Sequence, residues 1–394
     1  MPPGCAGGAC EITHQRRRAW YLRRPPLPSG VRYPRPVRVL LVVFASKYTG
    51  AAATAEHCAR ALRAAGVDAR LLFTAGRNLE ARLAAADWAR AGFVKERTPA
   101  RVAANLRTLR AEAAHADVVV CHLPHDHLLC VAAGVHRRAT LVRNVRHPRH
   151  LRSDPWHRAV GRRVKGLILA FRDMGVRARL AFGDVPSLAL PVPLEHRFRP
   201  GADPAPWWHR LALDDRPTVA VVGKLAAGRG FELALEAVAR CGTTPQLVVV
   251  GDGELRPRLE RLSTELGIAG RVRWVGYQDD LPGILAAVDA LLFTAPGSDW
   301  GHRVVSEAQG CAVPVVAASI TGIDDLIDDR RTGLVAPGTP DALAAAIDRL
   351  LDDRELRSTI AASAVAAAER RRFEPTGRAL ADHLDHVAAG RTAT

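Results

Sequence analysis

Two carboxylates, Asp299 and Glu307, are separated by seven residues in a stretch where a helix is expected to begin near His302. The apolar runs 290–294 and 313–317 flank this stretch, so strand, glycine-rich turn, helix and strand form one parallel crossover unit. Ligands of open parallel sheets bind beyond the carboxyl ends of the strands, where a helix N-terminus offers unpaired backbone N–H groups. The stretch therefore suits a phosphate-bearing ligand. The alternative is structural, with Asp299 as the helix N-cap and Glu307 as a solvated helix residue.

Strand and helix patterns alternate along most of the chain and predict the elements that position this stretch. In the first half, strands are expected at 37–44, 67–73, 117–122 and 140–145, and helices at 52–65, 79–91 and 99–115. In the second half, strands are expected at 218–222, 246–251, 272–276, 290–294, 313–317 and 334–335, and helices at 231–239, 254–266, 281–287, 341–351, 354–369 and 376–387. This order predicts an α/β protein with two Rossmann-like, doubly wound parallel sheets in tandem.

Proline-rich segments divide the chain. Residues 1–36 are rich in Pro and Arg with little apolar periodicity, and we expect a disordered basic tail there. Prolines between 188 and 206 interrupt the strand–helix rhythm and mark a domain junction. We therefore expect, after the tail, an N-terminal Rossmann-like domain at 37–200, a linker at 201–215, a C-terminal Rossmann-like domain at 216–372, and a helical segment at 373–394 that packs back on the first domain.

Charge and cysteine usage restrict the class of protein. The chain of 394 residues contains 56 Lys and Arg against 40 Asp and Glu, a formal net charge of +16. Such an excess attracts nucleotides, nucleic acid or anionic lipid head groups without selecting among them. The cysteine count is odd, at seven, and no Cys-x-x-Cys occurs, so we expect reduced thiols in a cytoplasmic protein. No apolar run is long enough to span a bilayer.

Several segments of the second half together resemble a known family. In order, they are 221–230, 248–253, 272–277, 295–314 and 325–335, and they are similar to the GT-B glycosyltransferases of family 4, the glycosyl transferases group 1. One glycine-rich turn would be weak evidence, whereas five matching segments in order are specific. The resemblance is close over about 216–351. Residues 37–200 match in architecture and in the segment 190–199, which resembles the segment before the family's linker.

The resemblance implies a site for a nucleotide-diphosphate sugar. Glu307 would accept hydrogen bonds from ribose hydroxyls, and Asp299 from hydroxyls of the transferred sugar, although Asp299 is one methylene shorter than the family's Glu. Lys224 and Arg229 would stabilise the departing diphosphate without a required metal, with the two residue types exchanged relative to the family. Solvated loop cations are the alternative for this pair. We expect further donor contacts from Gly223, Tyr277, Gly301, His302, Arg303 and Val304.

The first half offers candidate contacts to the transferred sugar or the acceptor. Gly50 and Ala51 precede a helix and would present backbone N–H groups, although a tight turn explains Gly50 equally well. The family commonly has a sugar-contacting His after a middle strand, and either Arg146 or His147 holds that place.

Histidines follow another strand of the first half, in the segment 121–127. A polar loop is favoured over a zinc site, because supporting ligand spacing is missing, and acceptor contact through His122 and His125 is a lesser alternative. We expect no metal and no cofactor. The Arg-rich run 137–163 is either a membrane-facing or anionic-acceptor patch, or a solvated surface.

The function that the resemblance implies is transfer of a sugar from a nucleotide-diphosphate sugar, with retention at the anomeric carbon. The expected partners are this donor and an unidentified acceptor, a cell-envelope glycan, a lipid or a metabolite, with peripheral contact to the inner face of an anionic membrane. Nucleic acid is not expected, because paired Cys/His fingers and aromatic RNA-binding motifs are missing. The alternatives are a hydrolysing nucleotide-sugar epimerase on the same scaffold and an inactive basic module that binds membrane or nucleic acid.

Overall fold

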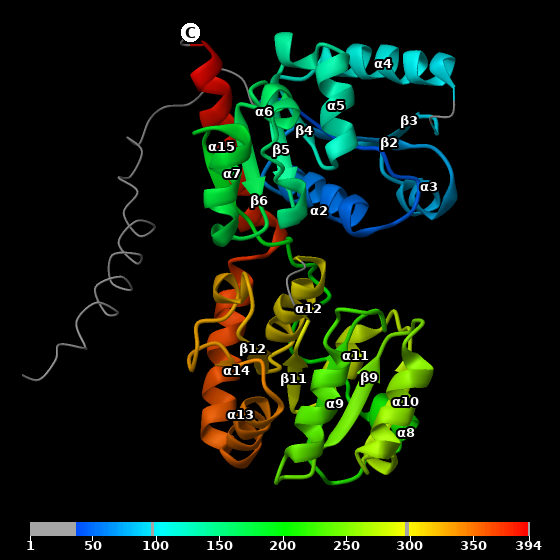
Figure 1. Ribbon diagram of the computed structural model, residues 1–394, viewed down its shortest axis with the longest axis vertical. Coiled ribbons are helices and arrows are strands. Elements are labelled where there is room, and N and C mark those ends of the chain that lie inside the picture. Colours follow the sequence, from blue (N-terminus) through cyan, green and yellow to red (C-terminus); the bar gives the residue numbers. More distant parts are fainter. Residues whose placement is uncertain (1–36, 96–97, 296–298, 393–394) are drawn as a thin grey trace, which may run out of the picture. The chain divides into compact units, whose positions relative to one another are not determined.

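The computed structural model describes residues 37–95, 98–295 and 299–392. Within these residues the strands form one sheet of seven strands and another of six, drawn as arrows in Figure 1. The expected basic tail at 1–36 lies outside the described residues.

The first sheet is parallel throughout, in the order β3-β2-β1-β4-β5-β6-β7. Its strands are β1 (Val39–Val43), β2 (Ala69–Thr74), β3 (Ala89–Phe93), β4 (Val118–Cys121), β5 (Thr140–Val145), β6 (Gly166–Leu169) and β7 (Ser187–Ala189). The direction of strand addition reverses between β1 and β4. The loops that follow these two strands therefore meet at a topological switch point, where open α/β sheets bind ligands.

The second sheet is also parallel, in the order β10-β9-β8-β11-β12-β13. Its strands are β8 (Thr218–Val222), β9 (Gln246–Val250), β10 (Val272–Gly276), β11 (Ala290–Phe293), β12 (Val315–Ala318) and β13 (Leu334–Ala336). Its switch point lies between β8 and β11. The predicted pair of doubly wound parallel sheets is confirmed.

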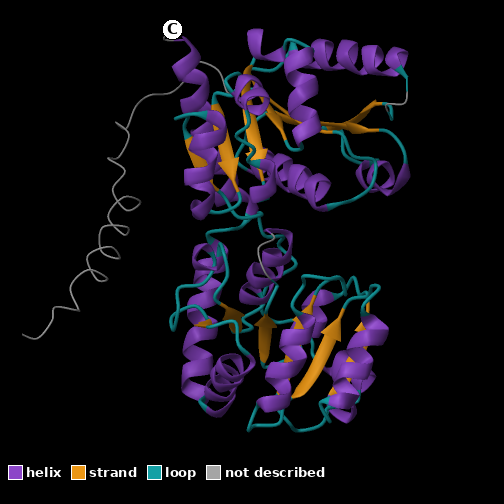
Figure 2. Ribbon diagram, in the orientation of Figure 1, coloured by secondary structure: helices purple, strands orange, loops and turns teal. Residues whose placement is uncertain are grey.

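Helices surround the strands of each sheet, as Figure 2 shows in purple and orange. Beside the first sheet they are α2 (Gly50–Ala64), α3 (Arg77–Leu83), α4 (Pro99–Ala113), α5 (Pro124–Ala132), α6 (Pro155–Gly161) and α7 (Gly175–Phe182). They continue with α8 (Ala205–Leu211), α9 (Phe231–Arg240), α10 (Arg256–Glu265), α11 (Leu281–Ala286), α12 (Asp299–Gly310), α13 (Pro340–Asp352), α14 (Arg354–Glu369) and α15 (Phe373–Thr392). Short 3-10 turns lie at η1 (Val135–Arg137), η2 (Pro148–His150), η3 (Arg172–Met174), η4 (Ala269–Arg271) and η5 (Ile323–Asp325).

Side-chain caps fix several helix starts, since Thr98, Asp154, Thr339 and Asp353 each accept a backbone N–H of the first turn.

Successive residues of a strand point to opposite faces of the sheet, and both faces are buried under helices. In β1, Leu40 and Val42 belong to the core that includes residues of α4, α5 and α7. Val39, Leu41 and Val43 belong to the opposite core, which includes residues of α2 and α15. Burial on both faces explains why these strands are apolar along their whole length.

The last helix, α15, packs against the first sheet. Its Leu380, Leu384 and Val387 are buried in the same core as Leu62 of α2. The segment after residue 372 therefore adds a helix to the first half of the structure, after the chain has passed through the second. No helix in the described part of the chain is both long and apolar enough to cross a membrane.

One predicted helix is wrong in its second part. Residues 79–91 have helical spacing and many alanines, but the helix α3 ends at Leu83, and residues 89–93 form the strand β3. β3 pairs with β2 from Leu71 onwards, and this tertiary pairing overrides the helix propensity of alanine. The short strands β6 and β7 were not predicted, because their few residues carry little periodicity.

The expected linker, 201–215, contains a folded element. α8 occupies Ala205–Leu211, and the indole Nε1 of the buried Trp207 donates to Asp280 Oδ2 at 2.8 Å. Trp208 donates through its own Nε1 to the Ala287 carbonyl oxygen at 3.1 Å. The two tryptophans fix this segment to the residues that directly precede and follow α11.

Candidate functional site

The strands β8, β9 and β10 each end at a glycine or just before one. Gly223 donates its N–H to the Val250 carbonyl oxygen at 2.9 Å, and Gly251 donates to that of Gly276 at 2.8 Å. Gly251 has φ of +137°, and a Cβ there would lie 1.8 Å from the Gly223 carbonyl oxygen. Only glycine permits this close approach of two strand ends.

These strand ends line a pocket of about 480 Å³. The walls include residues that the sequence had assigned to a donor site, namely Gly223, Lys224, Arg229, Tyr277, Arg303, Val304 and Glu307. The pocket lies at the switch point of the second sheet, since the loop after β8 forms one side and α12, which follows β11, another. Its volume is typical of small-molecule sites. A cationic loop and an acidic helix residue that lie far apart in the sequence thus face the same space.

Lys224 is an exposed cation of this pocket. Its Nζ lies 3.8 Å from the Glu254 carboxylate, and 66% and 62% of the two side chains are exposed. An exposed pair at this distance contributes little to stability. The ammonium group can therefore exchange this partner for an anionic ligand at small cost.

The second cation, Arg229, lies between Gly228 and Gly230, whose φ angles of +73° and +74° are left-handed. A Cβ at Gly230 would lie 2.3 Å from the Thr294 carbonyl oxygen, and the Thr294 hydroxyl donates to the Gly230 carbonyl oxygen at 2.7 Å. The loop that carries Arg229 is therefore fixed against the end of β11.

Glu307 lies on α12 with only 5% of its surface exposed, so the solvated-helix alternative is wrong. Arg303, one turn earlier, forms an ion pair with it through Nε, and the Arg303 Nη2 lies 3.0 Å from Glu195 Oε1. Burial raises the pKa of Glu307, and the charge and hydrogen bond of Arg303 oppose this effect. The result is a buried carboxylate that Arg303 orients at the pocket wall, with lone pairs left for ligand hydroxyls.

Further charged residues of the pocket were not predicted. Arg197 donates through Nη1 to the Asp279 carbonyl oxygen at 2.8 Å and lies 3.3 Å from Glu195 Oε2. The exposed Tyr277 donates its hydroxyl to Asp279 Oδ1 at 2.8 Å. Arg197 belongs to the segment 190–199, which was predicted to lie at the domain junction and to resemble the family's segment before the linker, without a role in the site. Among the described side chains, the cations of the pocket are Arg197, Lys224, Arg229 and Arg303, and its carboxylates are Asp252, Asp279 and Glu307.

The helix α12 begins at Asp299, earlier than the predicted start near His302. Asp299 and Gly301 therefore belong to its first turn. Their side-chain surroundings, and residues 296–298 before them, lie outside the described part. The contact of Asp299 with a transferred sugar stays a prediction.

The side chain of His302 does not line the pocket. It is buried, with its ring centroid 4.7 Å from that of Phe171 and 5.1 Å from that of Phe293. Its Nε2 lies 3.1 Å from the Thr321 carbonyl oxygen. The imidazole packs between two phenylalanines, because the helix face that carries it points to the core. A donor contact of His302 stays a prediction.

The candidate residues of the first half lie near the switch point of the first sheet. Gly50 is the first residue of α2, where the Thr54 hydroxyl donates to its carbonyl oxygen at 2.9 Å, and Ala51 follows it in the first turn. Arg146 is buried and donates through Nη1 to the Leu190 carbonyl oxygen at 2.6 Å. His147 accepts the Arg149 N–H at its Nδ1, at 3.1 Å, and so caps a short 3-10 turn. Neither Arg146 nor His147 lines the pocket described above.

The segment 121–127 is stabilised from within. The buried Asp126 accepts backbone N–H groups from Phe44 at 3.0 Å, His122 at 3.2 Å and Leu123 at 2.7 Å, and burial raises its pKa to about 6. His122 is buried as well, which lowers its pKa to about 3 and keeps it neutral. His125 is exposed and meets the Phe44 ring edge-on at 5.5 Å. Among the described residues, no group of three or more His, Cys, Asp or Glu is placed to hold a metal ion.

Solved structures define the class of fold. HepE from Anabaena, solved in complex with UDP and glucose, matches with a TM-score of 0.75 over 89% of this chain and 99% of its own, at 20% sequence identity. The chain thus has the GT-B fold of two Rossmann-like parallel-sheet domains.

Sequence comparison finds a family match in the second half of the chain. Residues 216–353 match the family model described as glycosyl transferases group 1, in a chain with the GT-B fold. The alpha-D-kanosaminyltransferase of Streptomyces kanamyceticus is 38% identical over 162 residues, which are 39% of this chain and 42% of that protein. The lipopolysaccharide core biosynthesis glycosyltransferase LpsE of Rhizobium meliloti is 36% identical over 156 residues, 39% of this chain and 45% of that protein. The chain therefore spans less than half the length of these curated relatives. The residues that match the family model, 216–353, include most of the pocket's lining.

Proposed function

We propose that the protein is a nucleotide-sugar-dependent glycosyltransferase whose donor binds in the 480 Å³ pocket. The observation that carries this proposal is that Lys224, Arg229 and Glu307, assigned from separate sequence segments, line one pocket at the carboxyl ends of the strands. A nucleoside diphosphate offers groups that match them, an anionic diphosphate for the cations and a ribose diol for the carboxylate. The names of the relatives and the UDP bound to HepE support the same class of ligand.

In this proposal Lys224 and Arg229 hold the diphosphate, and Glu307 accepts hydrogen bonds from the ribose hydroxyls. Arg303 positions Glu307 through their ion pair. Asp299 meets the hydroxyls of the transferred sugar. Gly223, Tyr277 and Val304 shape the walls around the nucleotide.

Transfer breaks the bond between the anomeric carbon and the leaving diphosphate oxygen, and forms a bond from that carbon to the acceptor oxygen. The acceptor oxygen attacks on the face from which the phosphate leaves, so the anomeric configuration is retained. The leaving phosphate takes the acceptor's proton, so no side chain acts as the base. Lys224 and Arg229 stabilise the negative charge that develops on the diphosphate, so the reaction requires no metal ion. The chain's contribution is positioning and charge stabilisation.

The acceptor belongs to the first half of the chain in this account. We propose an acceptor from the cell-envelope glycans, lipids or small metabolites, and a cytoplasmic protein with peripheral contact to the inner face of an anionic membrane. The Arg-rich run 137–163 and the formal net charge of +16 support this contact.

The test is incubation with a panel of UDP-, GDP- and ADP-sugars, followed by thermal shift and by release of nucleoside diphosphate. We expect one class of nucleotide to raise the melting temperature and to be released in the presence of an acceptor preparation, with and without EDTA. The double variant K224A/R229A should lose both signals while remaining folded, since Lys224 is an exposed loop residue and Arg229 a half-exposed one.

Other outcomes contradict the proposal in distinct ways. Binding without release under every condition would point to an inactive binding module. Appearance of a free epimerised sugar would point to a hydrolysing epimerase. A thermal shift that survives in K224A/R229A would place the nucleotide outside this pocket.

A further inference from the structure

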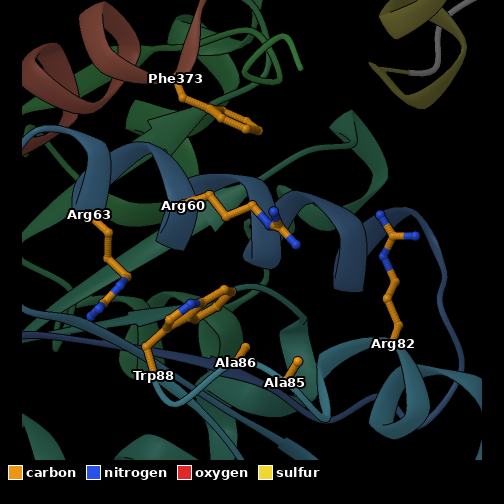
Figure 3. Close-up of a pocket in the computed structure, with 7 residues that line it drawn as sticks. All are labelled: Arg60, Arg63, Arg82, Ala85, Ala86, Trp88 and Phe373. Atoms are coloured by element: carbon orange, nitrogen blue, oxygen red, sulfur yellow. The ribbon is translucent and has the colours of Figure 1, made fainter. Parts of the chain in front are cut away.

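A second group of cations surrounds Trp88, beside the first sheet (Figure 3). Arg60 and Arg63 lie on α2 three positions apart, a spacing that puts both on one face of the helix. Arg82 comes from α3, and Trp88 from the turn before β3. With Phe373 on the far side, these side chains line a pocket of about 370 Å³.

The positive charge of this pocket is only partly neutralised. Glu56 is fully buried and is shared by two arginines, with Oε1 2.8 Å from Arg60 Nη2 and Oε2 3.0 Å from Arg82 Nε. Arg63 donates to the Ala69 carbonyl oxygen at 3.3 Å. Its nearest carboxylate, Asp87, is 4.0 Å away and 89% exposed, a pair of little strength.

The buried Glu56 therefore holds the guanidinium groups of Arg60 and Arg82 in place, but its one negative charge does not balance the three arginines. Between 36% and 46% of each arginine side chain remains exposed. Guanidinium N–H groups arranged in this way bind phosphate or carboxylate through paired, charge-assisted hydrogen bonds.

Trp88 adds an apolar surface to the cations. The guanidinium carbons of Arg60 and Arg63 lie 5.9 Å and 6.0 Å from the centroid of its ring. Figure 3 shows Arg60 and Arg63 on α2 and Trp88 on the turn below this helix. A ligand with a flat ring and an attached oxyanion would contact the indole through the ring and the arginines through the charge.

A third hollow of about 240 Å³ shares lining residues with this pocket and with the proposed donor site. The third hollow shares Arg60, Arg82 and Phe373 with the Trp88 pocket, and shares Arg197 with the 480 Å³ pocket. A molecule of several rings could therefore reach from Trp88 to the place where a sugar would be transferred.

We propose that the Arg60–Arg63–Arg82 pocket binds an oxyanion, a phosphate or a carboxylate, carried by the acceptor, with a ring of the acceptor against Trp88. The hydroxyl that receives the sugar then points past Arg197 towards the donor site. The identity of the ligand as an acceptor rests on the proposed function. The oxyanion site itself rests on the geometry of the pocket. It makes the acceptor an anionic molecule.

The test is isothermal titration of the full chain with glucose, glucose 6-phosphate and glucuronate as probes. Vesicles of phosphatidylcholine with and without phosphatidylglycerol form a separate arm, because a lipid head group offers the same oxyanion. We expect at least one anionic probe to bind about tenfold or more tightly than its neutral counterpart. The variants Arg63→Gln and Trp88→Leu should each weaken this binding about tenfold.

The matched control is Arg107→Gln, which removes one exposed charge from α4 in the same half of the chain. Arg63 is preferred over Arg60 for the test, because Arg60 pairs with the buried Glu56 and its loss affects folding. Binding to anionic vesicles alone, lost in Arg63→Gln, identifies the lipid head group as the carrier of the oxyanion.

The inference is overturned when neither the anionic sugars nor the anionic vesicles bind more tightly than their neutral counterparts, or when Arg107→Gln has the same effect as Arg63→Gln. UDP titration of the same samples separates this inference from the proposed function. Arg63→Gln should leave UDP affinity unchanged. A wild-type chain that binds glucose 6-phosphate but no nucleoside diphosphate would refute the donor site and leave the oxyanion site standing.

Discussion

The 480 Å³ pocket and the Trp88 pocket are both cationic, but different parts of the chain build them. The 480 Å³ pocket consists largely of strand ends and the loops that follow them, with glycines where backbone segments approach closely. The Trp88 pocket consists of long side chains that project from α2 and α3 towards a turn. A site made from the backbone tolerates few sequences, whereas a site made from side chains depends on spacing across several elements.

The acidic partners differ in the same way. Glu307 lines its pocket and is accessible to a ligand, with Arg303 beside it. Glu56 lies behind the arginines of the other pocket and is fully buried. The first arrangement offers a ligand both an acceptor and donors of hydrogen bonds, whereas the second offers donors and an aromatic surface.

The largest effect is expected from Gly251→Ala. A Cβ at this position would overlap the Gly223 carbonyl oxygen, in a backbone conformation that L-residues rarely adopt. We expect a loss of about 3 kcal/mol or more in the free energy of unfolding, measured by urea denaturation. Gly270→Ala is the control, because a Cβ there meets no atom within 4 Å, and it should change stability by less than about 1 kcal/mol. Equal effects of the two substitutions would contradict a backbone-built pocket.

Glu307→Gln should give the next largest effect. The amide keeps the size of the side chain but removes the charge that pairs with Arg303 and accepts the ribose hydroxyls. We expect the affinity for the cognate nucleoside diphosphate to fall about 30- to 100-fold in isothermal titration. Glu254→Gln, which alters only the exposed partner of Lys224, should stay within about twofold. An unchanged affinity in Glu307→Gln would remove this residue from the site.

The free energy of unfolding should depend on pH through His57, which lines the hollow of about 240 Å³. This residue is buried, its Nδ1 lies 3.1 Å from the Pro193 carbonyl oxygen, and burial together with the nearby charge of Arg303 lowers its pKa to about 4. The unfolded chain binds the proton at the ordinary pKa, so stability is lost as pH falls from about 6.5 towards 4. At pH 5 the free energy of unfolding should be lower by about 2 kcal/mol than at high pH because of His57.

The measurement is urea denaturation of the wild type and of His57→Gln at pH 7 and pH 5. The variant should lose less stability than the wild type between these two values. An identical loss in both would show that His57 does not titrate as its burial implies.

Lys224→Ala is expected to have the smallest effect of the four. The ammonium is exposed, so its removal leaves the free energy of unfolding unchanged, and it lowers the affinity for the nucleoside diphosphate about tenfold at low salt. The difference from wild type should shrink as ionic strength rises. Lys165 is an exposed lysine of the first half, outside the pocket. Its substitution, Lys165→Ala, controls for net charge and should leave the affinity unchanged.

The contrast between the pockets also explains what the sequence could predict. The strand ends at Gly223, Gly251 and Gly276 were recognisable because apolar runs lead directly into glycine, and the loop cations Lys224 and Arg229 follow in the same segment. Glu307 was recognisable from its spacing to Asp299. These residues are close to one another in sequence within each segment, so local patterns record them.

The residues of the Trp88 pocket and the burial of His302 depend on tertiary contacts, which local sequence patterns do not record. Trp88 lies in a turn where an Ala-rich pattern predicted helix, and the pairing of β3 with β2 decided otherwise. Arg60 and Arg63 stand among many arginines, and only the fold of α2 against the turn at Trp88 selects them. The side chain of His302 was assigned to the donor, but the packing of Phe171 and Phe293 around it is visible only in the structure.

The central claim is that one pocket on the second sheet holds a nucleoside diphosphate, and a crystal structure with UDP, or with the nucleotide selected by thermal shift, tests it most directly. The account predicts the diphosphate within hydrogen-bond distance of Lys224 and Arg229, and the ribose hydroxyls on Glu307. A nucleotide bound elsewhere, with these three side chains unchanged and in contact with solvent, would contradict it.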